Sequence, residues 1–160
     1  MGTAQAASVI DAPIDVVWAV MLDTERYPEW NPFVVRIDLP RQRPVQVDDP
    51  IVLHVRWLTG GRTTSSERVT KIEPPEAHAG RRALLEYQYH GALHGPGLIR
   101  GRRKQELSRL DDAVTSYSTF EHLKGPLAWA APMVKVRDGF ERHAAALKAR
   151  AEAVHRGEPT

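Results

Sequence analysis

The spacing of apolar residues changes twice along the chain, and each change predicts a different kind of element. After Pro13 the apolar positions lie three and four residues apart, which predicts a first helix with one buried face. They are Ile14, Val17, Trp18 and Met21. Asp23 and Thr24 can end this helix and begin a second short one, since Pro28 and Pro32 prevent a long continuation. Residues 3–10, before the first helix, have a weakly β-like pattern.

From Phe33 onward apolar and polar positions alternate, which predicts about six consecutive strands. The segments are 33–39, 51–58, 63–72, 83–90, 98–107 and 113–122. Turn residues separate them: 40–50 is a turn region, Gly60-Gly61 suits a hairpin, and Asp111-Asp112 suits another turn. Consecutive strands joined by short connections predict an antiparallel sheet.

After Pro132 the helical period returns and continues for about six turns. Its apolar stripe is Met133, Val136, Phe140, Ala144, Leu147, Ala151 and Val154. A sheet with one apolar face needs a cover, and this helix is the candidate. The sequence therefore predicts an α+β fold, with a curved antiparallel sheet of about seven strands wrapped around the long C-terminal helix and two short helices after the first strand. The last few residues are polar and expected to be frayed.

Composition narrows the class of protein. The 160 residues suit one domain, 1–160, and the absence of cysteine excludes disulfides and thiolate chemistry. No signal peptide or membrane span is recognised, so we expect a cytoplasmic protein. The basic cluster at 100–104 suggests nucleic-acid binding, but a formal net charge of only +2 favours the solvated side of a strand instead.

The order of elements, together with the segment IDAPIDVVWAVMLDTERYPEWNPFV (10–34), resembles the START-like or SRPBCC superfamily. The likeness is greatest to its bacterial polyketide cyclase/dehydrase-like branch. The matching positions are Ala12-Pro13, Val17-Trp18, Tyr27, Trp30, Asn31, Pro32, Phe33, Val69, Pro74-Pro75, Gly101, Glu121, Gly125 and Leu127. The resemblance covers essentially the whole chain and implies a helix-grip fold with a ligand pocket between sheet and helix. The fold hosts carriers, sensors and cyclases, so it does not by itself give the function.

Alternation places several polar side chains on the face expected to look toward the helix. Gly101, Arg103, Gln105 and Leu107 share one face, as do Tyr117, Thr119 and Glu121 on the next strand. In the functional interpretation Arg103 holds a carboxylate, enolate or phenolate oxygen, Tyr87, Tyr89 or Tyr117 donates a proton, and Glu121 acts as acid or base. Two alternatives stay open: a structural Arg103–Glu121 pair, or a register shifted by one that puts Arg103 in water.

Apolar side chains are expected to line the rest of the pocket. With Gln105 and Thr119, the ligand-binding candidates are Trp30, Phe33, Leu53, Val55, Trp57, Leu85, Tyr89, Trp129, Met133, Val136 and Phe140. Each taken alone also suits an ordinary core position, and Trp30 and Asn31 suit structural roles at the junction after the short helices. The Gly- and Pro-rich loops at 91–97 and 123–132 are expected to form the mouth, with Trp129 as a gate.

The histidines add little to the predicted chemistry. His90 and His94 have no evident further ligands, so no metal is expected. His54 and His122 are expected to face water. His143 lies beside the stripe of the last helix, where a surface position is favoured over one reaching the cavity.

The sequence is compatible with three functions. The first is a cyclase or dehydratase that orients a flexible apolar substrate and uses acid–base groups without a metal or redox cofactor. The second is a carrier or sensor of a lipid-like or aromatic molecule, and the third is a protein-interaction module. We expect an apolar or aromatic small-molecule partner, neither nucleic acid nor membrane, and a monomer or homodimer.

Overall fold

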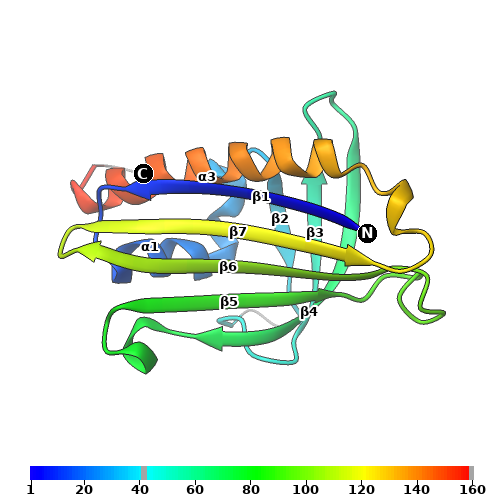
Figure 1. Cartoon of the computed structure of the whole chain (residues 1–160). Helices are drawn as coiled ribbons and strands as arrows, with labels where there is room; N and C mark the ends of the chain where they lie inside the picture. The colour runs from blue at the N-terminus through cyan, green and yellow to red at the C-terminus, as the bar shows by residue number, and fades with distance from the viewer. Residues whose placement is uncertain (41–42, 159–160) are drawn as a thin grey trace.

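The computed structural model describes residues 1–40 and 43–158, which form one antiparallel sheet with helices on its concave side (Figure 1). The strands are β1 Gly2–Ile10, β2 Val34–Asp38, β3 Pro50–Arg56, β4 Arg62–Glu73, β5 Arg82–Tyr89, β6 Arg100–Asp111 and β7 Val114–Lys124. Their order is β1-β7-β6-β5-β4-β3-β2, so six strands follow one another as neighbours and β1 adds to β7. The predicted sheet is confirmed.

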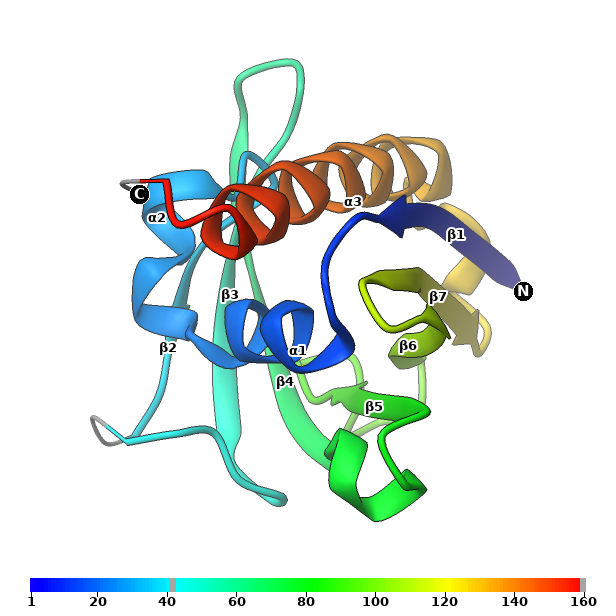
Figure 2. The ribbon, with the colours of Figure 1, turned by 90° about the vertical axis from the view of Figure 1, so that its left-hand side faces the viewer.

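Helices occupy the inside of the curved sheet. They are α1 Ile14–Leu22, α2 Tyr27–Trp30 and the long α3 Met133–His155, with short 3₁₀ turns η1 Thr24–Arg26, η2 Pro75–His78 and η3 Ala128–Ala130. In Figure 2 α1 lies between α3 and the strands β5 to β7, which closes one end of the grip. The α+β helix-grip architecture expected from the sequence is confirmed. Among the described residues no helix is long and apolar enough to cross a membrane.

The buried faces follow the periodicity in most elements. All four apolar residues predicted for the first helix face are buried, as are Ile51, Leu53 and Val55 on β3. The stripe of α3 is buried at Phe140, Ala144, Leu147 and Ala151. Val154 departs from it with 39% exposure, because the C-terminal end of α3 borders a surface groove beside α1.

The β2 segment departs from strict alternation. An irregularity in its pairing with β3 lies between Val34 and Arg36, and Phe33 and Val34 are both buried. A bulge of this kind turns consecutive side chains to the same side. The predicted turn region 40–50 includes residues 41–42, and the expected frayed end includes 159–160, which lie outside the described residues.

A close approach of α3 to the start of β2 fixes the end of the grip. A Cβ added at Gly139 on α3 would lie 2.2 Å from the Phe33 ring, so only glycine allows this ring against the helix. The Phe33 ring packs edge-on against Phe140, at 6.0 Å between centroids, and against Trp57, at 5.7 Å. These contacts join α3 to β2 and to the end of β3.

Candidate ligand site between the sheet and α3

Polar side chains from β5, β6 and β7 gather on the concave face of the sheet. The register pairs Tyr87 with Arg103, Gln105 with Thr119, and Leu107 with Tyr117. All six side chains are buried. The inward faces expected from alternation on β6 and β7 are therefore those of the structure, and a register shifted by one does not apply.

Arg103 is a buried cation with few polar partners. Its Nε donates to Thr119 Oγ1 at 3.1 Å, and its guanidinium carbon lies 4.3 Å from the centre of the Phe140 ring. Its Nη2 has no hydrogen-bond partner in the described part of the chain. Glu121 is its direct neighbour across the β6–β7 ladder, yet no ion pair joins the two among the described residues. The charge is surrounded by the Thr119 hydroxyl, the Phe140 ring and the nearby carboxyl groups, yet Nη2 stays unsatisfied, which is costly for the fold.

Gln105 connects the two buried tyrosines. Its Nε2 donates to the Tyr87 hydroxyl at 2.7 Å, and its Oε1 accepts from the Tyr117 hydroxyl at 2.8 Å. Burial raises the pKa of both tyrosines, so both hydroxyls are neutral. Because Tyr87 accepts in this network, its own O–H remains able to donate to a further oxygen.

Two carboxyl groups lie near the same cation. Burial, with a smaller contribution from the neighbouring Glu121, raises the pKa of Glu67 to about 8 against the opposing effects of Ser65 and Arg103. Ser65 donates to Glu67 Oε1 at 2.6 Å. Burial also raises the pKa of Glu121, opposed by Arg103. At neutral pH Glu67 therefore holds its proton, and an acid and a potential base lie together.

His143 on α3 is fully buried, so its expected surface position was wrong. Its Nδ1 lies 2.7 Å from Asn31 Nδ2, and its ring lies 5.9 Å from that of Tyr117. Burial, with a smaller effect of the Arg103 charge, lowers its pKa well below the ordinary 6.5, so the imidazole is neutral. The reason for the error is that His143 lies three residues after Phe140 and four before Leu147, on the buried stripe itself.

The apolar candidates occupy three kinds of position. Phe33, Leu53, Val55, Leu85 and Phe140 are buried in the core. Trp30, Trp57, Met133 and Val136 are partly buried and pack against it. Tyr89 is partly buried and folds over Gly91, where an added Cβ would lie 2.2 Å from its hydroxyl oxygen. Trp129 is 77% exposed on η3, so the expectation that it lines the interior was wrong.

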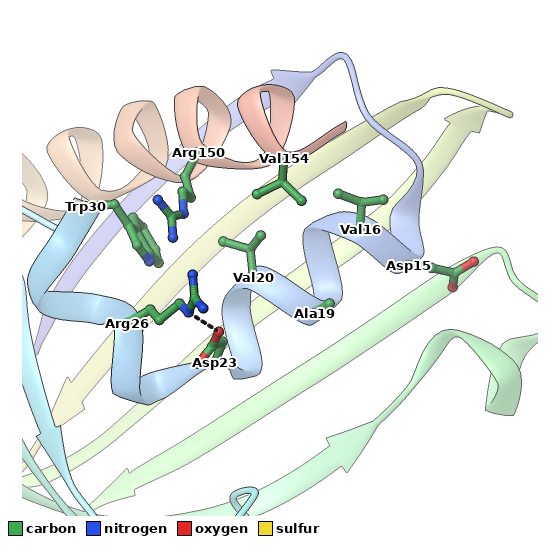
Figure 3. A pocket seen from close by; sticks show the side chains of 9 residues that line it. All are labelled: Asp15, Val16, Ala19, Val20, Asp23, Arg26, Trp30, Arg150 and Val154. Atoms are coloured by element: carbon green, nitrogen blue, oxygen red, sulfur yellow. Dashed lines mark ion pairs between the residues drawn. The ribbon is translucent and has the colours of Figure 1, made fainter. Parts of the chain in front are cut away.

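Five hollows on the molecule lie away from the polar side chains of β5, β6 and β7 on the concave face of the sheet. One of about 460 Å³ lies between α1, η1 and the end of α3, where Arg26 pairs with Asp23 beside Val20, Trp30 and Arg150 (Figure 3). Four others, of about 420 to 490 Å³, also lie outside the grip. None of the five is lined by Arg103, Gln105 or Tyr117.

The basic cluster at 100–104 divides between the two faces of β6. Arg103 points inward, whereas Arg102 and Lys104 are exposed on the outer face, each 3.7 Å from a Glu86 carboxylate oxygen. They border an outer hollow together with Phe120 and His122. His122 lies on the outer face of the sheet, as expected, but it is partly buried there and does not fully face water. Among the described residues no group of three or more His, Cys, Asp and Glu side chains is placed to hold a metal ion.

Glu67 was not among the site residues predicted from the sequence. Asn31 was expected to have only a structural role, and His143 was expected at the surface. Alternation on β4 contained the signal for Glu67, because it shares a face with Ser65 and the buried Val69. The signal for His143 was its place on the helical stripe. No sequence signal joins Asn31 to His143, since the two residues are 112 positions apart.

Comparisons with known proteins agree with the fold. The structure of a hypothetical protein from Helicobacter pylori superposes with a TM-score of 0.74 at 13% identity, covering 93% of this chain and 87% of the other. The Zhui aromatase/cyclase from Streptomyces sp. R1128 gives 0.72 at 17% identity, covering 94% and 93%. A START superfamily protein from Mycobacterium smegmatis gives 0.67 at 19% identity, covering 96% and 99%. At these identities the likeness concerns the fold alone.

Sequence comparison reaches the family. The oxopyrrolidines biosynthesis cluster protein O of Penicillium oxalicum is 24% identical, over 81% of this chain and 74% of its own length. Residues 1–152 match the family described as polyketide cyclase / dehydrase and lipid transport. The match spans every strand and nearly all of α3. The chain therefore belongs to the polyketide cyclase / dehydrase and lipid transport family.

Proposed function

We propose that this protein binds an apolar or aromatic small molecule between the sheet and α3 and catalyses its cyclisation or dehydration. The observation that carries the proposal is Arg103, a buried cation with an unpartnered Nη2 on the face of Phe140. A buried guanidinium with an unsatisfied N–H destabilises a fold, so a core that binds nothing gains nothing from this group. A ligand oxygen carrying negative charge would stabilise it.

The surrounding groups suit acid–base chemistry on a carbonyl compound. An aldol-type closure removes a proton from a carbon beside one carbonyl, forms a bond from that carbon to a second carbonyl carbon, and delivers a proton to the second oxygen. Arg103 would stabilise the enolate oxygen, an ionised Glu121 would accept the carbon-bound proton, and the protonated Glu67 or the Tyr87 hydroxyl would donate the other. Loss of water would then need one more proton removed from carbon and one given to the leaving hydroxyl.

A non-catalytic carrier or sensor is the second candidate. The family description includes lipid transport, and most side chains between sheet and helix are apolar. In a carrier Arg103 would bind a ligand carboxylate or phenolate without any change in bonding. The enzyme is favoured because groups able to donate and accept protons, Glu67, Glu121 and the Tyr87 hydroxyl, lie around the buried cation, where a carrier does not need them.

Native mass spectrometry separates the two functions. The purified protein is measured before and after mixing with an extract of its source organism, and the extract is compared by mass. An enzyme converts one extract species into a related one that is isomeric with it or lighter by water. A carrier retains a species of unchanged mass. If the protein neither converts nor retains a species, the proposal is contradicted, and a role in protein interaction becomes the hypothesis to test.

Matched variants connect the result to the site. Arg103→Met removes the inward cation, and Arg102→Met removes its exposed neighbour on the outer face of β6. We expect Arg103→Met to abolish conversion or retention while the protein stays folded, and Arg102→Met to behave as the unchanged protein. Equal effects of both substitutions would argue against Arg103 as the ligand-binding group.

A further inference from the structure

The amide of Asn31 has a fixed orientation. Its Oδ1 accepts the backbone N–H groups of Phe33 and Val34, each at 3.0 Å. Two N–H donors require an oxygen at that position, so the nitrogen of the amide must lie on the other side. That nitrogen, Nδ2, lies 2.7 Å from His143 Nδ1. Because an amide nitrogen only donates, Nδ1 of His143 must accept.

The tautomer of His143 follows from this bond. A neutral imidazole carries one proton, and Nδ1 accepts from Asn31, so the proton is on Nε2. Burial lowers the pKa of His143 well below 6.5, which agrees with a neutral ring. The buried Nε2–H has no hydrogen-bond partner within the described residues.

The two unpartnered donors belong to neighbouring residues of the interior, close enough for the Arg103 charge to act on His143. His143 lies one helical turn after Phe140. The guanidinium carbon of Arg103 lies 4.3 Å from the centre of the Phe140 ring. The Tyr117 ring, 5.9 Å from that of His143, belongs to the strand beside Arg103. A buried donor without an acceptor destabilises a fold, so two of them in one core are costly unless a bound group accepts from them.

We propose that His143 Nε2–H and Arg103 Nη2 together bind one oxygen of the ligand, and that Asn31 is the positioning residue that holds His143 in the required tautomer. The inference rests on the proposed function, because the ligand enters the same interior. Arg103 supplies the positive charge and His143 a neutral donor. This combination selects an ionised or strongly polarised oxygen, such as an enolate or phenolate, over an apolar group of the same size.

The tautomer is tested on the unaltered protein by ¹⁵N NMR of its histidine side chains. We expect His143 Nε2 to carry the proton and Nδ1 to show the shift of an unprotonated nitrogen. His143→Phe identifies the signal. A proton on Nδ1 would overturn the inference whatever the ligand is.

The donor pair is tested with two probes of nearly equal shape, 2-naphthol and 2-methylnaphthalene. They differ only in a hydroxyl group that replaces a methyl group, so the ratio of their dissociation constants measures the preference of the site for an oxygen. We expect 2-naphthol to bind at least about tenfold more tightly, and the preference to fall below about threefold in His143→Phe and in Arg103→Met. His122→Phe is the matched control, because its Nε2 is also buried without a partner but lies by the outer hollow.

The outcomes separate this inference from the proposed function. If both probes bind with equal affinity and His143→Phe changes neither, the interior takes apolar ligands but the donor pair is absent. If neither probe binds, the ligand site itself is contradicted, and the inference with it. A preference for 2-naphthol that survives in His143→Phe but not in Arg103→Met would remove His143 from the pair.

Discussion

Asn31 and His143 are joined by a buried 2.7 Å hydrogen bond across 112 residues of sequence. The bond connects the end of α2 to the middle of α3 and fixes a ring that faces Tyr117. The same Asn31 accepts the first backbone N–H groups at the start of β2. One amide therefore organises both the entry into the sheet and the orientation of an interior histidine.

A double-mutant cycle measures how strongly these two residues interact. We expect Asn31→Ala to destabilise the protein by about 2–4 kcal/mol, because two buried backbone N–H groups and His143 lose their partner. Combined with His143→Phe, the loss should be smaller than the sum by about 1 kcal/mol. Urea unfolding measures each value. Strict additivity would show that the Asn31–His143 bond contributes nothing to stability.

Arg103 and Gln105 should respond in opposite ways when made apolar. Arg103→Met removes a buried charge with an unsatisfied Nη2, so stability should stay the same or rise by about 1–3 kcal/mol. Gln105→Leu should cost about 1–3 kcal/mol, because it leaves the buried hydroxyls of Tyr87 and Tyr117 without their partner. Thermal unfolding of both variants compares them. A large loss of stability in Arg103→Met would instead indicate a structural role for this cation.

Glu67 should make stability depend on pH between about 4.5 and 8. Its pKa is about 8 in the folded protein against an ordinary 4.5, so the folded state holds a proton that the unfolded chain releases. Stability is therefore greatest below about pH 4.5 as far as this group is concerned, and falls as pH rises toward 8.

His143 contributes the opposite slope below its ordinary pKa of 6.5, since protonation favours the unfolded chain. The interval from 6.5 to 8 lies above the range in which His143 acts, and there Glu121, whose pKa burial also raises, adds a slope of the same sign as that of Glu67. We expect urea midpoints to fall across it, and the fall to become clearly smaller in Glu67→Gln. An unchanged slope in Glu67→Gln would show that this carboxyl is ionised in the folded protein.

For Gly139→Ala, helix propensity and side-chain packing predict stability changes of opposite sign. Glycine to alanine within a helix stabilises by about 1 kcal/mol from propensity alone. A Cβ at Gly139 would meet the Phe33 ring at 2.2 Å, so we expect Gly139→Ala to destabilise by about 1–3 kcal/mol instead. The exposed Ala145 on the same helix is the control, because Ala145→Gly should show propensity only. A stabilising Gly139→Ala would mean that Phe33 moves at little cost.

The sequence by itself determined the elements and the faces that they bury. Periods of two and of three to four residues gave the strands, the helices and the inward side of β6, because alternation and helical spacing are properties of the local backbone. The same periodicity placed Arg103, Gln105 and Thr119 inside, where the structure has them.

Only the tertiary structure decided which of these groups meet. Arg103 could pair with Glu121 by register, yet its guanidinium lies on Phe140 from α3 and bonds to Thr119. Trp129, apolar by type, is exposed, whereas His143, polar by type, is buried. The docking of α3 sets these outcomes through contacts such as Gly139 on Phe33. Contacts between residues more than 100 positions apart depend on how the elements pack against one another, and the local periodicity of the sequence does not determine that packing.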